Sequence, residues 1–483
     1  MRTHGLICVA LLAGYSCSGG RESTTPIVST GPSVQVVETT ADGTLLLQPR
    51  PTVAFAASRS PTGAVITVND STKYQQIDGF GASLTDSAAW VIAHKLSSAE
   101  QTHLWQSLFD TREGIGISFL RQPMGATDFS ASGNYSYDDM PPGQTDPTLA
   151  NFSIAHDTAY ITPLLQRALA VNPRIKIVAV PWSPPAWMKT SGTMNGGHVN
   201  PAYFPSLAQY FVKFVRQYQE QGIQIYAVLP QNEPLNSNRS YPTAYLAAND
   251  EASFIGTNLG PALQAAGFGS VKILSYDHNW KTPSYPQTVL ADPAASSYVA
   301  GSAFHCYAGD VGAQSTVKSA FPNKDIWFTE CSGTVATSLA NDLAWDAEHL
   351  LIGATRNWAR SVSLWNLALD QNSGPQNGGC TNCRGVVTID DSASPATVGH
   401  NVEYYLLGHV ARFVLPGAYR IDSNSFRHGS IEDVAFQNPD GSIALLVLNS
   451  ASANRTFAVN WSGQSFQYAL PAGAVATFRW KPQ

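Results

Sequence analysis

The sequence contains few charged residues, which limits what the protein can bind. Lys, Arg, Asp and Glu make up 13% of the 483 residues, about half of the ~25% usual in soluble domains. The 28 basic and 34 acidic residues give a formal net charge of -6, and no dense basic run occurs. A nucleic-acid groove or a polybasic membrane surface needs clustered cations. The sequence therefore predicts an uncharged partner and no nucleic acid.

Long apolar runs and two well-known catalytic motifs are also missing. After the amino terminus no stretch approaches 18 uninterrupted apolar residues, so no transmembrane segment is expected there. No G-x-S-x-G and no G-x-G-x-x-G occurs, which disfavours a serine hydrolase and a dinucleotide enzyme. Apolar residues make up 44% of the chain, so general disorder is excluded and a folded protein of two domains is expected.

The amino terminus is typical of an export signal. Arg2 precedes an apolar run from Gly5 to Gly14, and small residues follow as far as residue 20. We therefore expect a signal over residues 1–20, a flexible spacer rich in Ser, Thr, Gly and Pro over residues 21–33, and a secreted or periplasmic protein. Cys17 stands where a bacterial lipoprotein carries its lipid, but the residues before it fit that site poorly, so a lipid anchor stays open.

The cysteines favour a disulfide over a metal site. Cys380 and Cys383 form a C-x-x-C, but no second pair follows at the spacing of a zinc ribbon. In an exported chain such a pair favours a local disulfide. Cys306 and Cys331 are either bridged or free, and the sequence does not decide between these states.

Both ends of the chain show the pattern of an all-β domain. Near the amino terminus, strands are expected over residues 34–37, 44–47 and 64–68, the first two flanking the turn at Asp42-Gly43. Near the carboxyl terminus, strands are expected over residues 432–437, 442–448, 455–460, 466–470 and 474–480. Neither group alone buries both faces of a sheet, so we predict one β-sandwich built from residues 34–70 and 406–483.

Between these groups, eight apolar runs alternate with helix-like segments such as residues 160–171 and 203–220. This α/β pattern predicts a (β/α)8 TIM barrel over residues 71–405, with a doubly wound open sheet as the alternative. The eight expected strands are residues 74–80, 116–121, 176–181, 224–230, 271–276, 301–305, 325–329 and 361–365.

Two carboxylates stand at the ends of expected barrel strands, where the active sites of such barrels lie. Glu233 follows the fourth strand and Glu330 follows the seventh. Retaining glycoside hydrolysis needs two carboxyl groups about 5 Å apart, one as acid/base and one as nucleophile. Taken singly, Glu233 is also explained by a helix that begins at Pro234, and Glu330 by an ion pair. Together they favour catalysis.

Other strand ends carry residue types that bind sugars. We predict that these side chains line the same mouth, although an ion pair, a cap on the barrel or a core position would explain any one of them. The residues are Arg121, Asp128, Trp182, His305, Tyr307 and Trp365.

An ordered set of motifs resembles glycoside hydrolase family 30 from about residue 70 to the end of the chain. The set consists of Gln76 to Asp86 (QIDGFGASLTD), Arg121 to Ser130 (RQPMGATDFS), Pro181 to Met188 (PWSPPAWM), Gln231-Asn232-Glu233-Pro234, His305-Cys306-Tyr307 and Phe328-Thr329-Glu330. The resemblance implies a barrel with a β-sandwich made from both chain ends, and a retaining O-glycosyl hydrolase that needs no cofactor and no metal.

The resemblance also implies roles. Glu233 matches the general acid/base and Glu330 the nucleophile of a double displacement. Asn232 resembles the residue that binds the sugar 2-hydroxyl, Arg121 and Tyr307 resemble neighbours of the nucleophile, and the residues that hold the glycone match Asp128, Trp182 and Trp365. We expect Arg121 to keep Glu330 ionised, and Glu233 to have a raised pKa so that it arrives protonated.

The substrate is left open by the resemblance. Members of the family act on glucosylceramide, β-1,6-glucans and other β-glycosides, so the expected partner is a β-glucoside, a glycolipid or an oligosaccharide. A glucosylceramidase-like enzyme is the first expectation and an endo-β-1,6-glucanase the alternative, because a Gly-rich, Cys-containing insertion at residues 374–385 is expected near the mouth. A non-catalytic carbohydrate-binding protein would have no need of both Glu233 and Glu330.

Overall fold

The computed structural model describes residues 31–57, 63–392 and 394–482. The predicted signal over residues 1–20, Cys17 and most of the predicted spacer lie outside these residues. No helix in the described part of the chain is both long and apolar enough to cross a lipid bilayer.

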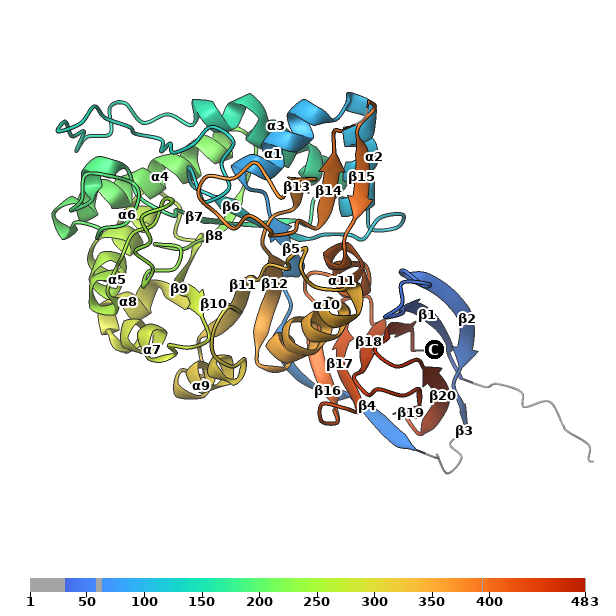
Figure 1. Cartoon of the computed structure of the whole chain (residues 1–483). Helices are drawn as coiled ribbons and strands as arrows, with labels where there is room; N and C mark the ends of the chain where they lie inside the picture. The colour runs from blue at the N-terminus through green and yellow to red at the C-terminus, as the bar shows by residue number, and fades with distance from the viewer. Residues whose placement is uncertain (1–30, 58–62, 393, 483) are drawn as a thin grey trace, which may run out of the picture.

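Eight parallel strands close into a barrel, which confirms the (β/α)8 prediction over an open sheet (Figure 1). Each predicted strand overlaps one observed barrel strand, and β12 pairs with β5 to close the circle. The barrel strands are β5 (Gly79–Ser83), β6 (Phe119–Pro123), β7 (Lys176–Val180), β8 (Ile225–Val228), β9 (Lys272–Asn279), β10 (Val299–His305), β11 (Asp325–Glu330) and β12 (Ala359–Leu364).

Helical segments surround the barrel strands and cover their apolar outer faces (Figure 1). They are α1 (Asp86–Lys95), α2 (Ser98–Phe109), α3 (Ala155–Val171), η1 (Ala186–Met188), η2 (Pro201–Tyr203), α4 (Phe204–Glu220), α5 (Ala248–Phe254), η3 (Ile255–Leu259), α6 (Gly260–Ala265), α7 (Ser284–Ala291), α8 (Pro293–Tyr298), α9 (Gly312–Ala320), α10 (Leu339–Asp346), η4 (Ala347–Ala354) and α11 (Val402–Ala411).

The first barrel strand begins later than the sequence predicts. Tyr74 belongs to β4 (Ala64–Gln76), a strand of the other domain, and the barrel strand starts only at Gly79. Between them the backbone of Ile77 bonds to Gly417 and Ala418. A Cβ at Gly79 would lie 2.6 Å from Ser118 Oγ. Gly79 also has a φ of +149°, which residues with a side chain rarely adopt. Glycine therefore allows the chain to pass directly from one sheet to the other.

The predicted β-sandwich is confirmed, and it joins both ends of the chain (Figure 1). Strand β1 pairs with β21, and β4 pairs with both β16 and β19. Although ten strands form one hydrogen-bonded series, Phe457 of β19 packs on Phe478 of β21 at 6.0 Å, so the sheet folds over one shared core. The strand order is β2 (Gln48–Ala54), β1 (Ser33–Thr39), β21 (Val475–Trp480), β18 (Ile443–Asn449), β17 (Ile431–Gln437), β16 (Tyr419–Ser423), β4, β19 (Arg455–Trp461), β20 (Gln464–Leu470) and β3 (Ala56–Ala57).

The amino-terminal hairpin differs from the prediction in its second strand. Residues 44–47 belong to the turn, and the strand that pairs with β1 is β2, which contains Pro49 and Pro51. Proline lacks a backbone N–H and is tolerated at a sheet edge, and β2 is the edge strand. Because prolines are uncommon in strands, the sequence pattern did not predict β2.

Helix α11 links the two domains, and the predicted boundary between residues 405 and 406 falls inside it. Its buried His409 lies between the hydroxyl groups of Thr39 and Thr477, with ring nitrogens 2.9 and 3.0 Å away from them. A small sheet precedes the helix and consists of β13 (Ala368–Asp370), β14 (Val387–Asp390) and β15 (Thr397–His400).

The carboxylate of Asp78 closes the amino-terminal end of the barrel. It is fully buried and accepts hydrogen bonds from side chains of four barrel strands: Lys176, Tyr226, Trp327 and Arg360. Burial by itself raises the pKa of Asp78, but Arg360 and Lys176 outweigh it and hold the pKa below its usual value. A charge without these partners would be costly at this depth.

We expect Asp78→Asn to lower the free energy of unfolding by about 3 kcal/mol at pH 7, because it leaves two cations without their buried partner. Asp325→Asn is the matched control, since Asp325 also pairs with Arg360 but is 36% exposed; it should cost below about 1 kcal/mol. Denaturant unfolding measures both. Because the pKa of Asp78 is lowered by folding, its contribution should be present above about pH 4 and lost as the pH falls further. Equal losses in the two variants would contradict the assignment.

Candidate active site

The predicted site residues meet at the carboxyl ends of the barrel strands. A cavity of about 450 Å³ opens there. Two further predicted residues, Arg121 and His305, lie fully buried next to it. The predicted residues that line the cavity are Asp128, Trp182, Asn232, Glu233, Tyr307, Glu330, Trp365, Cys380 and Cys383.

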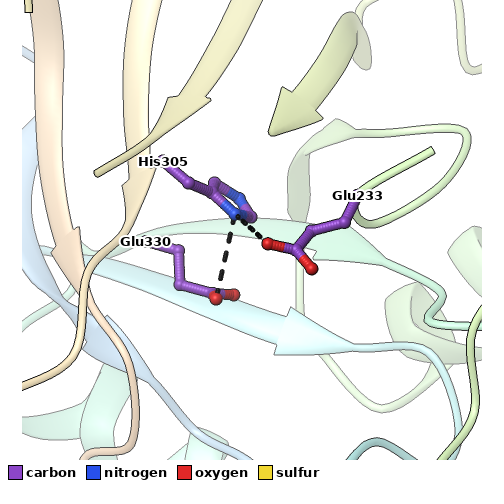
Figure 2. A group of neighbouring side chains, drawn as sticks. All are labelled: Glu233, His305 and Glu330. Atoms are coloured by element: carbon purple, nitrogen blue, oxygen red, sulfur yellow. Dashed lines mark hydrogen bonds and ion pairs between the residues drawn. The ribbon is translucent and has the colours of Figure 1, made fainter. Parts of the chain in front are cut away.

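Glu233 and Glu330 face each other across the cavity with His305 beside both (Figure 2). An oxygen of each carboxylate and a ring nitrogen of His305 all lie within 4.8 Å of one another. His305 Nδ1 is 3.3 Å from Glu233 Oε1 and 3.8 Å from Glu330 Oε1. The carboxylate separation therefore matches the ~5 Å of retaining glycoside hydrolysis.

Arg121 of β6 is the main partner of Glu330. Its Nη1 donates to Glu330 Oε2 at 2.6 Å, and its Nη2 donates to Asn232 Oδ1 and Asp277 Oδ2, each at 2.7 Å. The guanidinium group also lies 4.6 Å from the ring centre of Trp182, which stacks on Trp365. One buried cation thus fixes the carboxylate, an amide and the aromatic wall of the cavity.

Asp277 was not predicted, yet it joins the two cations of the site. It lies in β9 with a φ of 55°, a left-handed conformation that is uncommon for residues other than glycine. It accepts from Arg121 and from Thr329 Oγ1, and its Oδ1 is 3.1 Å from His305 Nε2. Although burial favours the neutral acid, Arg121 and His305 lower the pKa of Asp277 well below its usual range.

His305 is therefore a cation at neutral pH. Burial alone disfavours its charge, but Glu330 and Asp277 outweigh burial and raise the pKa of His305 to about 9. Its protonated Nδ1 points at both glutamates (Figure 2). The set Glu233, His305 and Glu330 also has the spacing of metal ligands; a metal ion bound there would have to displace the proton that His305 carries.

The pKa values of the two glutamates differ from those that the sequence predicts. Burial raises the pKa of Glu233, but the hydrogen bond and charge of His305 outweigh it and lower that pKa to about 2. For Glu330, burial outweighs the opposing charges of His305 and Arg121 and leaves the pKa above its usual value, so the expectation that Arg121 alone keeps Glu330 ionised also needs correction. The prediction that Glu233 has the raised pKa is thus wrong, because it ignored the cation 3.3 Å away.

Further side chains hold the two glutamates in place. Tyr307, as predicted, donates its hydroxyl hydrogen to Glu330 Oε1 at 3.0 Å. Asn236, which was not predicted, donates to Glu233 Oε2 at 2.8 Å. Glu233 itself has a φ of 45°. Reading the residues after the fourth and fifth strands as closely as the others would have found Asn236 and Asp277.

Asp128 offers a hydrogen-bonding group to a ligand. Its Oδ1 has no partner among the described residues. Desolvation, together with the charges of Glu330 and Glu233, raises the pKa of Asp128 well above its usual value. Because an unpaired polar atom in such a position is costly, a ligand hydroxyl group would find a partner here.

The insertion at residues 374–385 forms one wall of the cavity, as expected. Cys380 and Cys383 are joined by the predicted disulfide. The backbone N–H of Asn377 donates to the carbonyl of Asp128 at 2.7 Å. A Cβ at Gly379 would lie 2.7 Å from that carbonyl oxygen, so glycine lets the loop approach closely. The loop is therefore fixed against the part of the cavity that contains Asp128.

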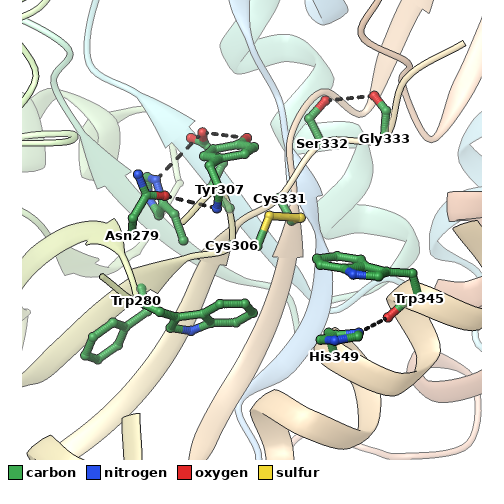
Figure 3. The surroundings of a disulfide bond; sticks show 12 residues. Asn279, Trp280, Cys306, Tyr307, Cys331, Ser332, Gly333, Trp345 and His349 are labelled. Atoms are coloured by element: carbon green, nitrogen blue, oxygen red, sulfur yellow. Dashed lines mark hydrogen bonds and ion pairs between the residues drawn. A yellow bond between two sulfur atoms is a disulfide. The ribbon is translucent and has the colours of Figure 1, made fainter. Parts of the chain in front are cut away.

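A second disulfide, which the sequence left open, joins Cys306 and Cys331 (Figure 3). Each cysteine directly follows a residue of the site, His305 in β10 or Glu330 in β11. The bond ties these two strand ends together where their side chains turn into the cavity.

Comparison with known proteins places this geometry in a family. The model described as the glycosyl hydrolase family 30 TIM-barrel domain matches residues 77–414, and that of the family 30 beta sandwich domain matches residues 417–478. An endo-1,6-beta-D-glucanase of Neurospora crassa is 36% identical, over 85% of this chain and 89% of that protein. The lysosomal acid glucosylceramidase of Mus musculus is 32% identical, over 89% of this chain and 86% of that protein. The solved structure of an endo-beta1,6-glucanase superimposes with a TM-score of 0.86 at 33% identity, over 93% of this chain and all of that one.

We expect His305 to titrate near pH 9, since Asp277 and Glu330 stabilise its charged form. In Asp277→Asn one of these charges is removed, so the pKa of His305 should fall. Nitrogen NMR of labelled histidine side chains measures both values, and His305→Gln identifies the signal by its loss. A value near 6.5 in the unsubstituted protein, or no change in Asp277→Asn, would contradict this electrostatic account.

Proposed function

The chain belongs to glycoside hydrolase family 30 and is a retaining O-glycosyl hydrolase, and on this basis we propose that it cleaves β-1,6-glucan within the chain by double displacement. In this proposal Glu330 is the nucleophile and Glu233 the general acid/base. The observation that carries the assignment is the pair of carboxylates whose oxygens lie within 4.8 Å, with His305 beside both.

In the first step, Glu330 attacks the anomeric carbon of the bound glucose. The bond from that carbon to the leaving oxygen breaks, and the leaving oxygen takes a proton from Glu233. Arg121 and Tyr307 position the attacking carboxylate, since both donate hydrogen bonds to it. The product of this step is an ester between the sugar and Glu330.

The proton for this step resides on His305 in the resting site. His305 Nδ1 lies 3.3 Å from Glu233 Oε1, so the two groups hold one proton between them. A sugar in the cavity excludes water and favours the neutral acid on Glu233. Because the pKa of Glu233 is low, the histidine supplies the proton that Glu233 passes to the leaving oxygen.

In the second step, Glu233 takes a proton from a water molecule, which attacks the same carbon and releases Glu330. Two inversions leave the β configuration unchanged. Asn232 is placed beside the nucleophile by its bond to Arg121 and would hold the 2-hydroxyl of the sugar. Asp128, Trp182 and Trp365 would hold the rest of the glucose ring, since the first has an unpaired oxygen and the others form a flat apolar wall.

The choice of β-1,6-glucan rests on the relatives and on the cavity wall. Endo-1,6-β-glucanases of Neurospora crassa and Aspergillus fumigatus are 36% and 34% identical, and the mouse glucosylceramidase is 32% identical. The disulfide-bonded insertion fixes a polar loop with Asn382 at the cavity, which suits a polysaccharide better than two lipid tails. Glucosylceramide is the second candidate, supported by that mouse relative.

We further propose that the protein works outside the cytosol. The amino-terminal sequence is typical of an export signal. Two disulfides are also more consistent with an oxidising compartment than with a reducing one.

We expect Glu330→Gln to abolish turnover of aryl β-glucosides while the unfolding temperature stays close to that of the original protein. Glu233→Gln should lower turnover by about 100 to 10,000-fold for poor leaving groups and much less for activated ones. Azide should separate the roles: with Glu233→Ala it should give the β-glycosyl azide, and with Glu330→Ala the α-glycosyl azide. Glu113→Gln, at an exposed position, is the control. Near-normal activity of Glu330→Gln would reject its role.

We expect linear β-1,6-glucan to be cut to oligosaccharides of mixed length, because an endo enzyme cleaves inside the chain. Chromatography of early products measures this, and product NMR should show the β anomer first. Glucosylceramide in detergent micelles is the comparison substrate and should be cleaved with at least tenfold lower kcat/KM. Efficient cleavage of glucosylceramide with no action on the glucan would reject the substrate, while leaving the retaining mechanism intact.

A further inference from the structure

A second groove lies away from the active-site cavity, between the helical segment α10–η4 of the barrel and the loop that leads into β17 of the sandwich. It has a volume of about 750 Å³. Trp345 and His349 stack in it at 4.5 Å, and Glu348 and His428 face each other across it. Its polar side chains come from both domains, so a ligand held here would touch both.

Three side chains in this region converge as metal ligands do. Glu348 comes from η4, His428 from the loop between β16 and β17, and Glu432 from β17. One ligand atom of each lies within 4.8 Å of the other two. His428 Nδ1 is 2.8 and 3.0 Å from the two oxygens of Glu348.

The third ligand is held rigidly. Glu432 is 8% exposed, and its Oε1 accepts a hydrogen bond from Ser450 Oγ at 2.5 Å. Ser450 Oγ in turn accepts from the backbone N–H of Gly429 at 3.0 Å, next to His428. Supporting bonds of this kind orient the ligands of metal sites. No hydrogen-bond donor reaches the other oxygen of Glu432 from the described residues.

The two carboxylates of the cluster favour a bound cation. Glu348 and Glu432 each bring a carboxylate oxygen within 4.8 Å of the other and of the single imidazole of His428. His428 is 75% exposed, so water can complete a coordination sphere on that side.

We propose that Glu348, His428 and Glu432 bind a divalent transition-metal ion, of which Zn²⁺ is the best match. One imidazole nitrogen with two carboxylates suits zinc, whereas magnesium and calcium prefer oxygen ligands alone. The ion joins η4 of the barrel to β17 of the sandwich. It adds to an existing link, since Arg356, two residues beyond η4, bonds to Asp433 and Ser423.

The test is a zinc titration of the metal-free protein by calorimetry, together with thermal unfolding. We expect one tight ion per chain and a rise in unfolding temperature of about 2–4 °C at saturation, because the ion binds the folded state. His428→Gln and Glu348→Gln should weaken binding at least tenfold and remove the rise. His103→Gln, the same change at a distant exposed histidine, should leave both unchanged.

The active-site set Glu233, His305 and Glu330 has similar spacing, so Glu233→Gln is a second control and should keep the ion. The proposal is overturned if the protein binds no zinc at millimolar concentration, if His428→Gln binds it as well as the original protein does, or if Glu233→Gln loses the ion. An equal temperature rise with Mg²⁺ would overturn the choice of a transition metal. None of these outcomes depends on the substrate.

Discussion

The active site depends on one buried carboxylate that need not touch the substrate. Asp277 lies between Arg121 and His305 and fixes both. Arg121 then holds Glu330 and Asn232, and His305 faces Glu233. Without Asp277, Arg121 and His305 would share a dry space with Glu233 and Glu330 as their only close counter-ions among the described residues. The negative charge of Asp277 favours the charged forms of both Arg121 and His305.

The barrel and the position of its site follow from local sequence patterns. Apolar runs marked the eight strands, and polar residues at their ends marked Glu233 and Glu330, because parallel strands of a closed barrel end on one face. The sequence did not predict strand β2, because Pro49 and Pro51 are tolerated in a strand only at a sheet edge. A local sequence pattern does not tell which strand lies at an edge.

The sequence also did not predict properties that depend on contacts between residues far apart in the chain. The low pKa of Glu233 arises from His305, 72 residues away in the chain. Asp277 belongs to no motif. Its place after the fifth expected strand marks it as a candidate, but its ion pairs form only in the closed barrel, where the side chain of β9 meets Arg121 of β6 and His305 of β10. The pairing of Cys306 with Cys331 required two neighbouring strand ends in register.

The bond between Cys306 and Cys331 has a consequence for how the protein should be produced. It is a covalent tether between the backbone beside the histidine and the backbone beside the nucleophile. A chain assembled in a bacterial cytoplasm would rely on non-covalent contacts, such as the pairing of β10 with β11 and the bonds of Asp277, to keep these two groups in register. The expression host therefore determines whether this disulfide forms and constrains the two catalytic strand ends. Thiol reagents in a purification buffer can reduce the same bond.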